Sequence, residues 1–200
     1  AAYPFKSLFL DAQRQRASTL GLDADFPITM AASLGPFVGA DIAAGAFAAG
    51  LTESDENALL IDFGTNGEIL LKRGDRFYAT ATAAGPAFEG GRLRCGSPAR
   101  RSVVSALSRK DGTWYHHFSD ADQWARPAGL SGAAYVDFLA CAVAEGILSP
   151  MGRFDPEHPE VESYAEDDET GRRVHVGKHL FVTEADVAEL IQAKAAIAAG

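Results

Sequence analysis

The residues best suited to chemistry lie in the stretch LLIDFGTNGEILL, residues 59–71. Its first three residues are apolar and the fourth is Asp62, which predicts a buried strand that ends at an acid. The dipeptide Asn66-Gly67 then favours a tight two-residue turn, because these residue types tolerate positive φ angles. The stretch is therefore expected to form a β-hairpin with an acid at the end of its first strand.

A hairpin of this composition can hold a phosphate. Gly64 and Gly67 have no Cβ atom, so the backbone N–H groups around Thr65 and Asn66 can converge on an anion. Asp62 can hold Mg²⁺ directly or through water, since carboxylate oxygens are ligands of this ion. Hairpins of this type are also common as plain structural turns, and the short pattern leaves both interpretations open.

A second segment, ATATAAGPAFEGGRLRCG (residues 79–96), follows the hairpin closely. Proline at the first position of a helix costs no hydrogen bond, so Gly85-Pro86 predicts a short helix whose first N–H groups form another anion site. Glu89 would repel a phosphate there unless it binds Mg²⁺. We expect Glu89 either beside the metal or as an acceptor for backbone N–H groups, and we favour the second role.

Together, DFGTNGE and AAGPAFEGG resemble the ATPase-like domain of reductive activators of corrinoid proteins, which belong to the superfamily of acetate kinase, sugar kinases, Hsp70 and actin. The resemblance covers nearly the whole chain, and the hairpin, AAGPAFEG and AKAAIAAG are its specific parts. Further similar segments follow in the family's order: GPFVGADIAAG at 35–45, GLSGAAYVDFLACAVAEGILSPMGRF at 129–154 and FVTEADVAELIQAKAAIAAG at 181–200.

The resemblance implies an α/β fold with a ribonuclease-H-like mixed sheet flanked by helices. It also implies that ATP and Mg²⁺ are cofactors, and that the longer protein promotes reduction of cob(II)alamin to cob(I)alamin on the corrinoid protein of a methyltransferase. In the family, electrons come from an N-terminal ferredoxin-like domain with an iron–sulfur cluster. This chain has two cysteines and a cluster usually needs four thiolates, so a cluster is expected only in a part outside it.

Asp41 is the candidate base or water-orienting residue. In the superfamily's sugar kinases, an aspartate in a Gly-Asp segment just ahead of the second phosphate hairpin has this role, and Asp41 occupies a similar place in the order of the chain. The residues themselves leave a second interpretation open, in which Asp41 caps the N-terminus of its helix by accepting N–H bonds.

The chain departs from the family pattern in two places. The residues Gly96 to Val103 replace a Gly-Met-x-Ala and Gly-Ala-Ile pattern. The residues Gly129 to Ala134, GLSGAA, replace Gly-Ile-Cys-Gly-Ser-Gly and lose a thiol, a hydroxyl and the last glycine. Alanines stiffen such a loop and favour a plain helix start, which counts against catalysis more than against binding.

Composition narrows the choice of partners. The 27 acids and 18 bases give a net charge of −9, which disfavours nonspecific nucleic-acid binding and anionic membranes. No apolar run reaches the ~18 residues of a membrane span, and no secretory signal pattern is present, so we expect a cytoplasmic protein. Cys95 and Cys141 lie in no CxxC arrangement and are expected to be free thiols.

The pattern divides the chain into the end of a first lobe with its connecting helix, 1–56, and a second-lobe portion, 57–200. The first part is expected to hold a helical segment around 5–20, a strand at 28–32 and a helix beginning near Asp41. The second part is expected to hold a strand at 77–83, a helix at 131–145, an exposed acidic loop near 155–173, a strand at 174–182 and a helix opened by a capping box at Thr183 and ending at Ala199.

Two other functions stay open. The altered loop at 129–134 favours a non-catalytic docking or dimerisation module on a degenerate ATPase fold, and a second copy of the chain is then a candidate partner. A small-molecule kinase of the same superfamily would need an acceptor pocket. The chain lacks the superfamily's earlier Asp-Gly-Thr hairpin and its later adenosine segment, so the 200 residues resemble a fragment that would be inactive alone.

Overall fold

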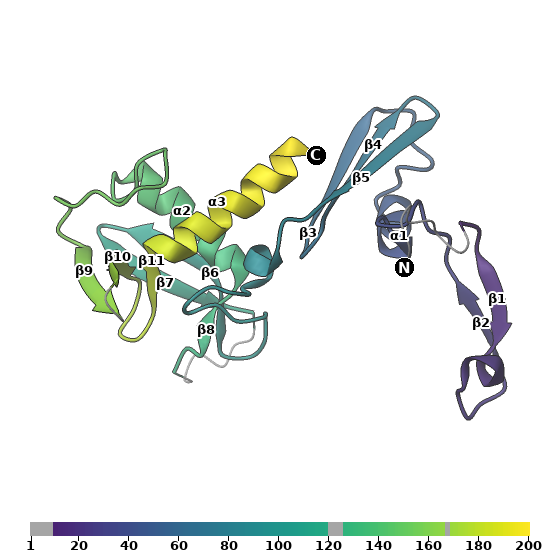
Figure 1. The fold of residues 1–200 in the computed structure, drawn as a ribbon, viewed down its shortest axis with the longest axis horizontal. Helices are drawn as coiled ribbons and strands as arrows, with labels where there is room; N and C mark the ends of the chain where they lie inside the picture. The colour runs from purple at the N-terminus through teal and green to yellow at the C-terminus, as the bar shows by residue number, and fades with distance from the viewer. Residues whose placement is uncertain (1–9, 120–125, 167–168) are drawn as a thin grey trace. The chain divides into compact units, whose positions relative to one another are not determined.

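The structure is a computed structural model that describes residues 10–119, 126–166 and 169–200 (Figure 1). The chain divides into two compact units, each with its own apolar core. Unit 1 comprises Ala1–Asp62, Gly67–Thr82 and Gly200, and unit 2 comprises Phe63–Asn66 and Ala83–Ala199. These units are groups of residues that contact one another and do not correspond to the two lobes expected from the sequence. The lobe boundary expected at residue 56 therefore stays a prediction.

The described part of unit 1 starts with a two-stranded antiparallel ribbon. Strand β1 (Gln13–Arg16) pairs with β2 (Pro27–Met30), and the 3-10 helix η1 (Ala17–Leu20) follows β1 directly. The helix expected around 5–20 is therefore wrong for the described part of that range. Strand pairing has overridden helix propensity here, and Gly21, with φ +78°, ends η1 after a single turn.

The rest of unit 1 packs one helix on a three-stranded sheet. The elements are α1 (Ala40–Ala48), β3 (Ala58–Phe63), β4 (Gly67–Arg73) and β5 (Arg76–Thr82), with strand order β3-β4-β5. The helix expected near Asp41 and the strand expected at 77–83 are confirmed. In α1, a Cβ on Gly45 would lie 3.4 Å from Leu60, so this helix approaches β3 closely. The first hairpin strand is not fully buried as expected: β3 is an edge strand, and Leu59 is 58% exposed.

Unit 2 contains two three-stranded sheets. In the first, of order β7-β6-β8, the β6–β7 pair is antiparallel and the β6–β8 pair is parallel. The second, of order β11-β10-β9, is antiparallel throughout. The strands are β6 (Val103–Lys110), β7 (Thr113–Phe118), β8 (Gly129–Leu130), β9 (Val161–Glu166), β10 (Glu169–His175) and β11 (Phe181–Thr183).

The acidic loop expected near 155–173 is wrong over its second half, where β9 and β10 form a ladder. The acidic composition of this stretch hides its capacity to form paired strands, which depends on the backbone ladder between β9 and β10. Glu162 accepts hydrogen bonds from the Arg173 guanidinium at 3.3–3.4 Å on one face, while Val174 is fully buried. The strand expected at 174–182 is interrupted, because β10 ends at His175 and the chain turns before β11.

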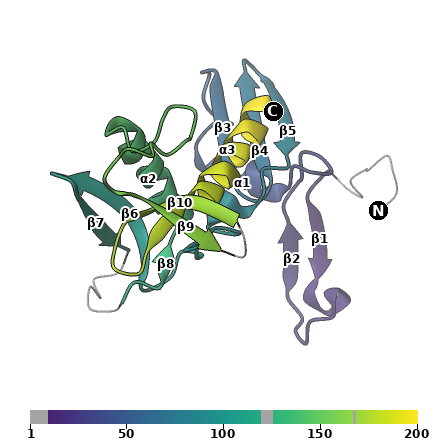
Figure 2. The same ribbon diagram turned by 60° about the vertical axis from the view of Figure 1, so that its left-hand side comes forward.

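Two helices and a short 3-10 helix complete unit 2 (Figure 2). They are α2 (Gly132–Ala144), α3 (Glu184–Ala199) and η2 (Pro86–Glu89), and α2 packs on β6 while α3 packs on β10 and β11. Both long helices start as expected. The Ser131 hydroxyl accepts a bond from the Ala134 N–H at 3.2 Å, and Asp186 forms a capping box with Thr183 at 2.9–3.1 Å. Among the described residues, no helix is long and apolar enough to cross a membrane.

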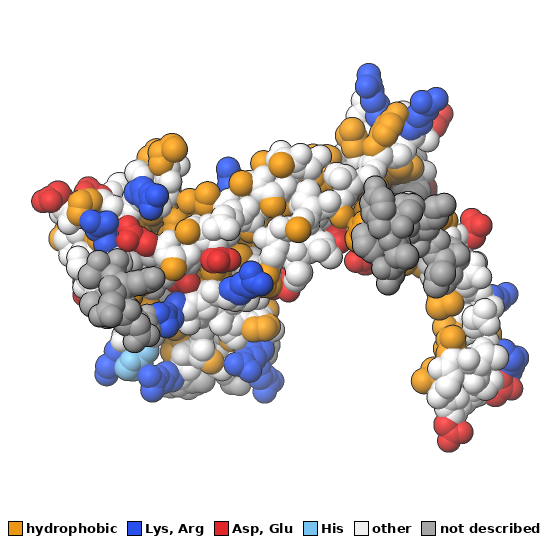
Figure 3. Space-filling view, viewed as in Figure 1, with side chains coloured by type: hydrophobic (Ala, Val, Ile, Leu, Met, Phe, Trp, Pro, Cys, Tyr) orange, Lys and Arg blue, Asp and Glu red, His pale blue; other side chains and the backbone are white. Residues whose placement is uncertain are grey.

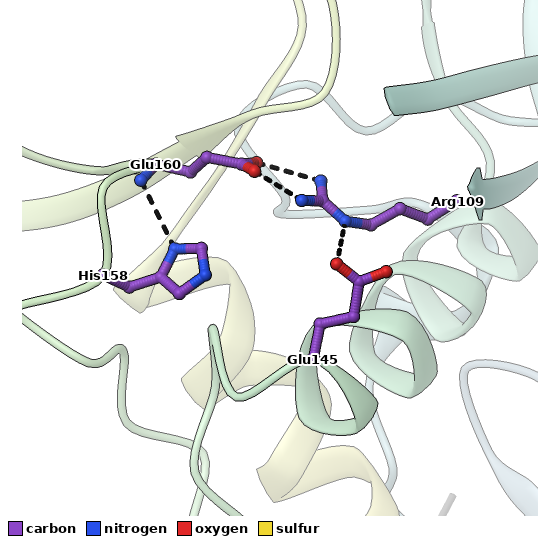
Figure 4. A network of polar contacts seen from close by, with 4 residues as sticks. All are labelled: Arg109, Glu145, His158 and Glu160. Carbon is purple, nitrogen blue, oxygen red and sulfur yellow. Dashed lines mark hydrogen bonds and ion pairs between the residues drawn. The ribbon is translucent and has the colours of Figure 1, made fainter. Parts of the chain in front are cut away.

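A buried arginine ties three segments of unit 2 together (Figure 4). The Arg109 side chain is only 2% exposed, and its guanidinium donates to Glu145 at 2.6 Å and to both carboxylate oxygens of Glu160. It also lies over the Trp114 ring, 4.7 Å from the centroid. The Glu160 N–H donates to His158 Nδ1 at 3.3 Å. The hydrogen bonds from Arg109 lower the pKa of Glu160, so this carboxylate stays ionised at neutral pH.

The segment that contains η2 lies so close to the start of α2 that only glycine fits. A Cβ on Gly132 would lie 1.7 Å from the Phe88 carbonyl oxygen, and one on Gly129 would lie 2.8 Å from the Cys95 carbonyl oxygen. Real Cβ atoms do not approach backbone this closely. The carboxylate of Asp186 also accepts the Arg94 N–H at 2.6 Å, which fixes the same segment to α3.

We expect Gly132→Ala to lower the free energy of unfolding of unit 2 by about 3 kcal/mol, because the backbone at Phe88 must move. Helix propensity alone predicts the opposite sign, a gain of up to ~1 kcal/mol. Urea unfolding followed by tryptophan fluorescence measures the difference, since both tryptophans fall within the range of unit 2. Ala133→Ser is the matched control at an exposed neighbour, with an expected change under ~0.5 kcal/mol. A stabilised Gly132→Ala protein would contradict the close approach.

Candidate functional site

The turn between β3 and β4 consists of Gly64, Thr65 and Asn66. The two-residue turn expected at Asn66-Gly67 is wrong, because Gly67 is already a buried residue of β4. None of residues 64–67 has a positive φ angle. The shape of the turn therefore does not depend on left-handed backbone geometry.

Thr65 joins this turn to the segment of η2, and both belong to unit 2. Its N–H donates to Glu89 Oε1 at 2.7 Å, and its hydroxyl lies 3.1 and 3.2 Å from the two oxygens of that carboxylate. Its carbonyl oxygen accepts the Gly85 N–H at 2.8 Å. The Phe63 and Phe88 rings meet edge to face, with centroids 5.5 Å apart. Two hydrogen bonds of the Thr65 backbone, to the Glu89 side chain and to Gly85, together with one aromatic contact, thus fix the turn against η2 and its N-cap residue.

Glu89 has the acceptor role that we favoured from the sequence. Its carboxylate occupies the Thr65 N–H, which is one of the donors expected to face a phosphate. An anion at the turn would have to displace this carboxylate or use the neighbouring N–H groups. A direct contact of Glu89 with Mg²⁺ stays a prediction.

The short helix expected after Gly85-Pro86 is present as η2, with proline at its start. Gly85 has φ +80° and ψ 169°, a region that is essentially restricted to glycine. This geometry aims the Gly85 N–H at the Thr65 carbonyl. Because η2 has only four residues, its dipole is a weak source of positive potential for an anion.

Three acids gather in unit 1: Asp41, Asp62 and Glu68. The pKa of Glu68 is raised, first by burial of its carboxyl and then by the negative charges of Asp41 and Asp62. Asp62 is exposed at the end of β3, and Glu68 is the second residue of β4. We missed Glu68 in the sequence, although its position one residue beyond Gly67 places it near the same end of the hairpin as Asp62.

This donor set suits Mg²⁺ that also binds phosphates. Within the described ranges, no three His, Cys, Asp or Glu side chains are arranged to hold a metal on their own. Mg²⁺ is commonly bound by only one or two carboxylates together with phosphate oxygens and water. Burial of the Glu68 carboxyl is the main cause of its raised pKa, and a cation would offset the smaller contribution from the negative charges of Asp41 and Asp62, so Asp62 and Glu68 fit that pattern.

Asp41 lies in the first turn of α1 and is exposed. The N-cap residue is Gly39, and a Cβ there would lie 2.6 Å from Asp41 Oδ1, so the carboxylate folds back over the helix N-terminus. A negative charge in this position stabilises the helix through its dipole. The geometry is compatible with both roles expected of Asp41.

The loop at 129–134 is a plain helix start, as its alanines predict. Gly129 and Leu130 form β8, Ser131 is the N-cap of α2, and Ala134 is fully buried. The Ser131 hydroxyl also donates to the Ser105 carbonyl at 3.1 Å. Both cysteines are free, as expected, and burial raises the pKa of the Cys95 thiol.

The chain is similar to known proteins over most of its length. Residues 56–200 match the sequence profile of the C-terminal domain of RACo, the ASKHA domain. The chain is 30% identical over 211 residues to the corrinoid activation enzyme RamQ of Eubacterium limosum, covering 96% of this chain and 35% of that protein. It is 25% identical over 181 residues to the [Co(II) methylated amine-specific corrinoid protein] reductase of Methanosarcina barkeri, covering 81% of this chain and 31% of that protein.

A solved structure, titled reductive activator for corrinoid,iron-sulfur protein, superposes with a TM-score of 0.81 at 28% identity. The match covers 98% of this chain and 32% of the other, so this chain spans about a third of the length of its relatives. The α/β fold class expected from the sequence is confirmed, as is the resemblance that led to it. The chain belongs to the family of the C-terminal ASKHA domain of RACo.

Proposed function

We propose that this chain is the ATP-binding part of a reductive activator, which restores the cob(I)alamin state of the corrinoid protein of a methyltransferase system. The observation that supports this most strongly is the alignment with a corrinoid activation enzyme, which is 30% identical and covers 96% of the chain. The electron would come from an iron–sulfur cluster in another part of the protein, and ATP hydrolysis would supply the free energy for an uphill one-electron reduction. Its free cysteines suit a cytoplasmic protein.

The hairpin is the proposed phosphate site. Backbone N–H groups of Gly64 to Gly67 would bind the phosphates, and Asp62 with Glu68 would hold Mg²⁺, directly or through water. Gly85 and Glu89 support this site by fixing Thr65. When bound, Mg²⁺ would neutralise phosphate charge, while Asp41 would orient the attacking water or accept its proton.

A non-catalytic docking module is the second candidate. It is favoured by the Thr65 N–H, which already has a partner, and by the plain helix start at 129–134. A small-molecule kinase is less well supported. A cavity of about 350 Å³ in unit 2 is lined mainly by aliphatic side chains such as Leu139, Val143 and Ile191, which do not suit transfer of a phosphoryl group to a polar acceptor.

Calorimetry with Mg-ATP, on the full-length gene product and on the 200-residue chain side by side, tests the proposal. Binding by the long protein, together with ATP-dependent appearance of the cob(I)alamin spectrum on the corrinoid protein, is the expected result. If neither protein binds Mg-ATP, the docking module is favoured.

Asp62→Ala should weaken Mg-ATP binding to the full-length protein at least about tenfold, because the metal loses a ligand or an oriented water. Asp75→Ala removes an acid from the exposed turn between β4 and β5 and should leave the affinity unchanged. Titrations with and without Mg²⁺ separate metal-dependent binding from the rest. Equal affinities of the Asp62→Ala and wild-type proteins would mean that the hairpin is only structural.

Asp41→Asn should lower the rate of ATP hydrolysis about 10²-fold or more with little change in ATP affinity, as removal of a general base does. Steady-state hydrolysis and thermal unfolding are measured on the same preparation. If the variant unfolds at a lower temperature but hydrolyses ATP at the normal rate, Asp41 serves the helix N-terminus only.

Glu89→Ala should speed hydrogen exchange of the Thr65 amide about tenfold, because a hydrogen bond to a charged acceptor is lost. Thr65→Val is the matched control, since it removes the hydroxyl and keeps the backbone bond to Glu89, so residue 65 should stay protected. Exchange is followed by mass spectrometry of fragments that cover the turn. Unchanged protection in Glu89→Ala would show that other contacts hold the turn.

A further inference from the structure

One end of the β7-β6-β8 sheet brings together three chain segments. Strand β6 begins there at Val103, β8 begins beside it, and β7 ends there at Phe118. The Ala128 N–H donates to the Ser102 carbonyl at 2.8 Å, which joins the approach to β8 to the turn before β6. These three segments therefore lie together at this end of the sheet.

The turn before β6 carries two adjacent arginines. It is closed by a bond from the Val103 N–H to the Arg100 carbonyl at 3.1 Å. Ser102 has φ +63°, a left-handed conformation that non-glycine residues adopt only where surrounding contacts enforce it. Arg100 and Arg101 are exposed, and they line a small cavity of about 170 Å³ together with Phe118.

Three further basic groups lie near one another in this part of unit 2. The Val176 carbonyl lies 2.6 Å from His116 Nε2, which places the turn after β10 beside β7. This turn carries Lys178 and His179. The pKa of His179 is lowered by partial desolvation and by the positive charges of Arg126 and Lys178. We call the following five residues the basic end: Arg100, Arg101, Arg126, Lys178 and His179.

The basic end contrasts with the charge of the whole chain, which is −9. Residues 90–110, 126–136 and 174–183 supply it and contain no acid at all. In Figure 3, blue side chains and a pale-blue histidine gather along the lower border of unit 2. Two acids of the sequence, Asp120 and Asp122, belong to a segment outside the described residues. Cations concentrated in this way on an anionic protein attract carboxylates and disfavour a polyanion as long as a nucleic acid, which the rest of the molecule repels.

We propose that the basic end docks an acidic face of the corrinoid protein, and this inference rests on the function proposed above. Arg100 and Arg101 are adjacent on a constrained turn, so their positive charges are held together at this end of the sheet at a low cost in backbone entropy, and their combined field attracts a carboxylate-rich surface. Charged pairs at such a surface chiefly raise the association rate and set the orientation of the partner.

The test measures binding of the full-length protein to its corrinoid protein by biolayer interferometry over salt concentrations from about 25 to 200 mM. We expect affinity to fall with salt for the wild type. Arg100→Glu with Arg101→Glu should raise Kd about tenfold or more at low salt, mainly through a slower association rate, and should flatten the salt dependence. Arg100→Gln with Arg101→Gln is the milder pair, with a smaller effect in the same direction.

The matched control is Arg73→Glu with Arg76→Glu, two exposed arginines that face each other across the β4–β5 hairpin of unit 1. It makes the same change of charge and should leave Kd unchanged. ATP binding and hydrolysis without the partner are measured on every variant. Normal association by both Arg100/Arg101 pairs, with ATP-driven activation intact, overturns the docking site and leaves the proposed function standing. Equal weakening by the control pair, or tighter binding of the wild type to a short single-stranded RNA than to the corrinoid protein, also overturns it.

Discussion

The close contact between Gly132 and the Phe88 backbone is the constraint on which the candidate site depends. It fixes the segment of residues 85–97 against α2, and the Asp186 carboxylate fixes the same segment against α3 through the Arg94 N–H. Only with this segment held in place can Gly85 and Glu89 bind both sides of Thr65. The shape of the turn is therefore set by the core of unit 2, which lies distant from it in sequence.

The same chain of contacts explains which predictions from sequence succeeded. Local signals were sufficient for the helix starts, because a side-chain oxygen at Ser131 or Thr183 satisfies a helix N–H only a few residues away. The turn at Asn66-Gly67 was predicted from local preference as well, but the bonds made by Thr65 decide its geometry. Preference for positive φ in isolated residues cannot anticipate a partner 24 residues further along the chain.

Two other differences have the same origin. Strand β1 is rich in Gln and Arg, which are good helix formers, yet its pairing with β2 supplies backbone bonds that a helix would otherwise make. The acidic residues of β9 suggested a solvated loop, whereas the ladder with β10 places Glu162 beside Arg173 on one face. Glu68 was missed for a different reason: its pKa is raised by burial and by the nearby charges of Asp41 and Asp62, and neither can be read from residue types alone.

The departure at 129–134 weighs less against catalysis than its sequence suggests. At residues 129 and 132 the backbone of a neighbouring segment is so close that only glycine fits, and the chain keeps glycine at both positions. Ala134 is fully buried, so a polar side chain there would need a partner within the core of unit 2. The Ser131 hydroxyl accepts a hydrogen bond from the Ala134 N–H at the helix N-terminus and donates one to the Ser105 carbonyl. In this chain the loop at 129–134 therefore has a structural role: it fixes residues 85–97, which in turn bind Thr65. Chemistry at the proposed phosphate site would depend on Asp62, Glu68 and Asp41 instead.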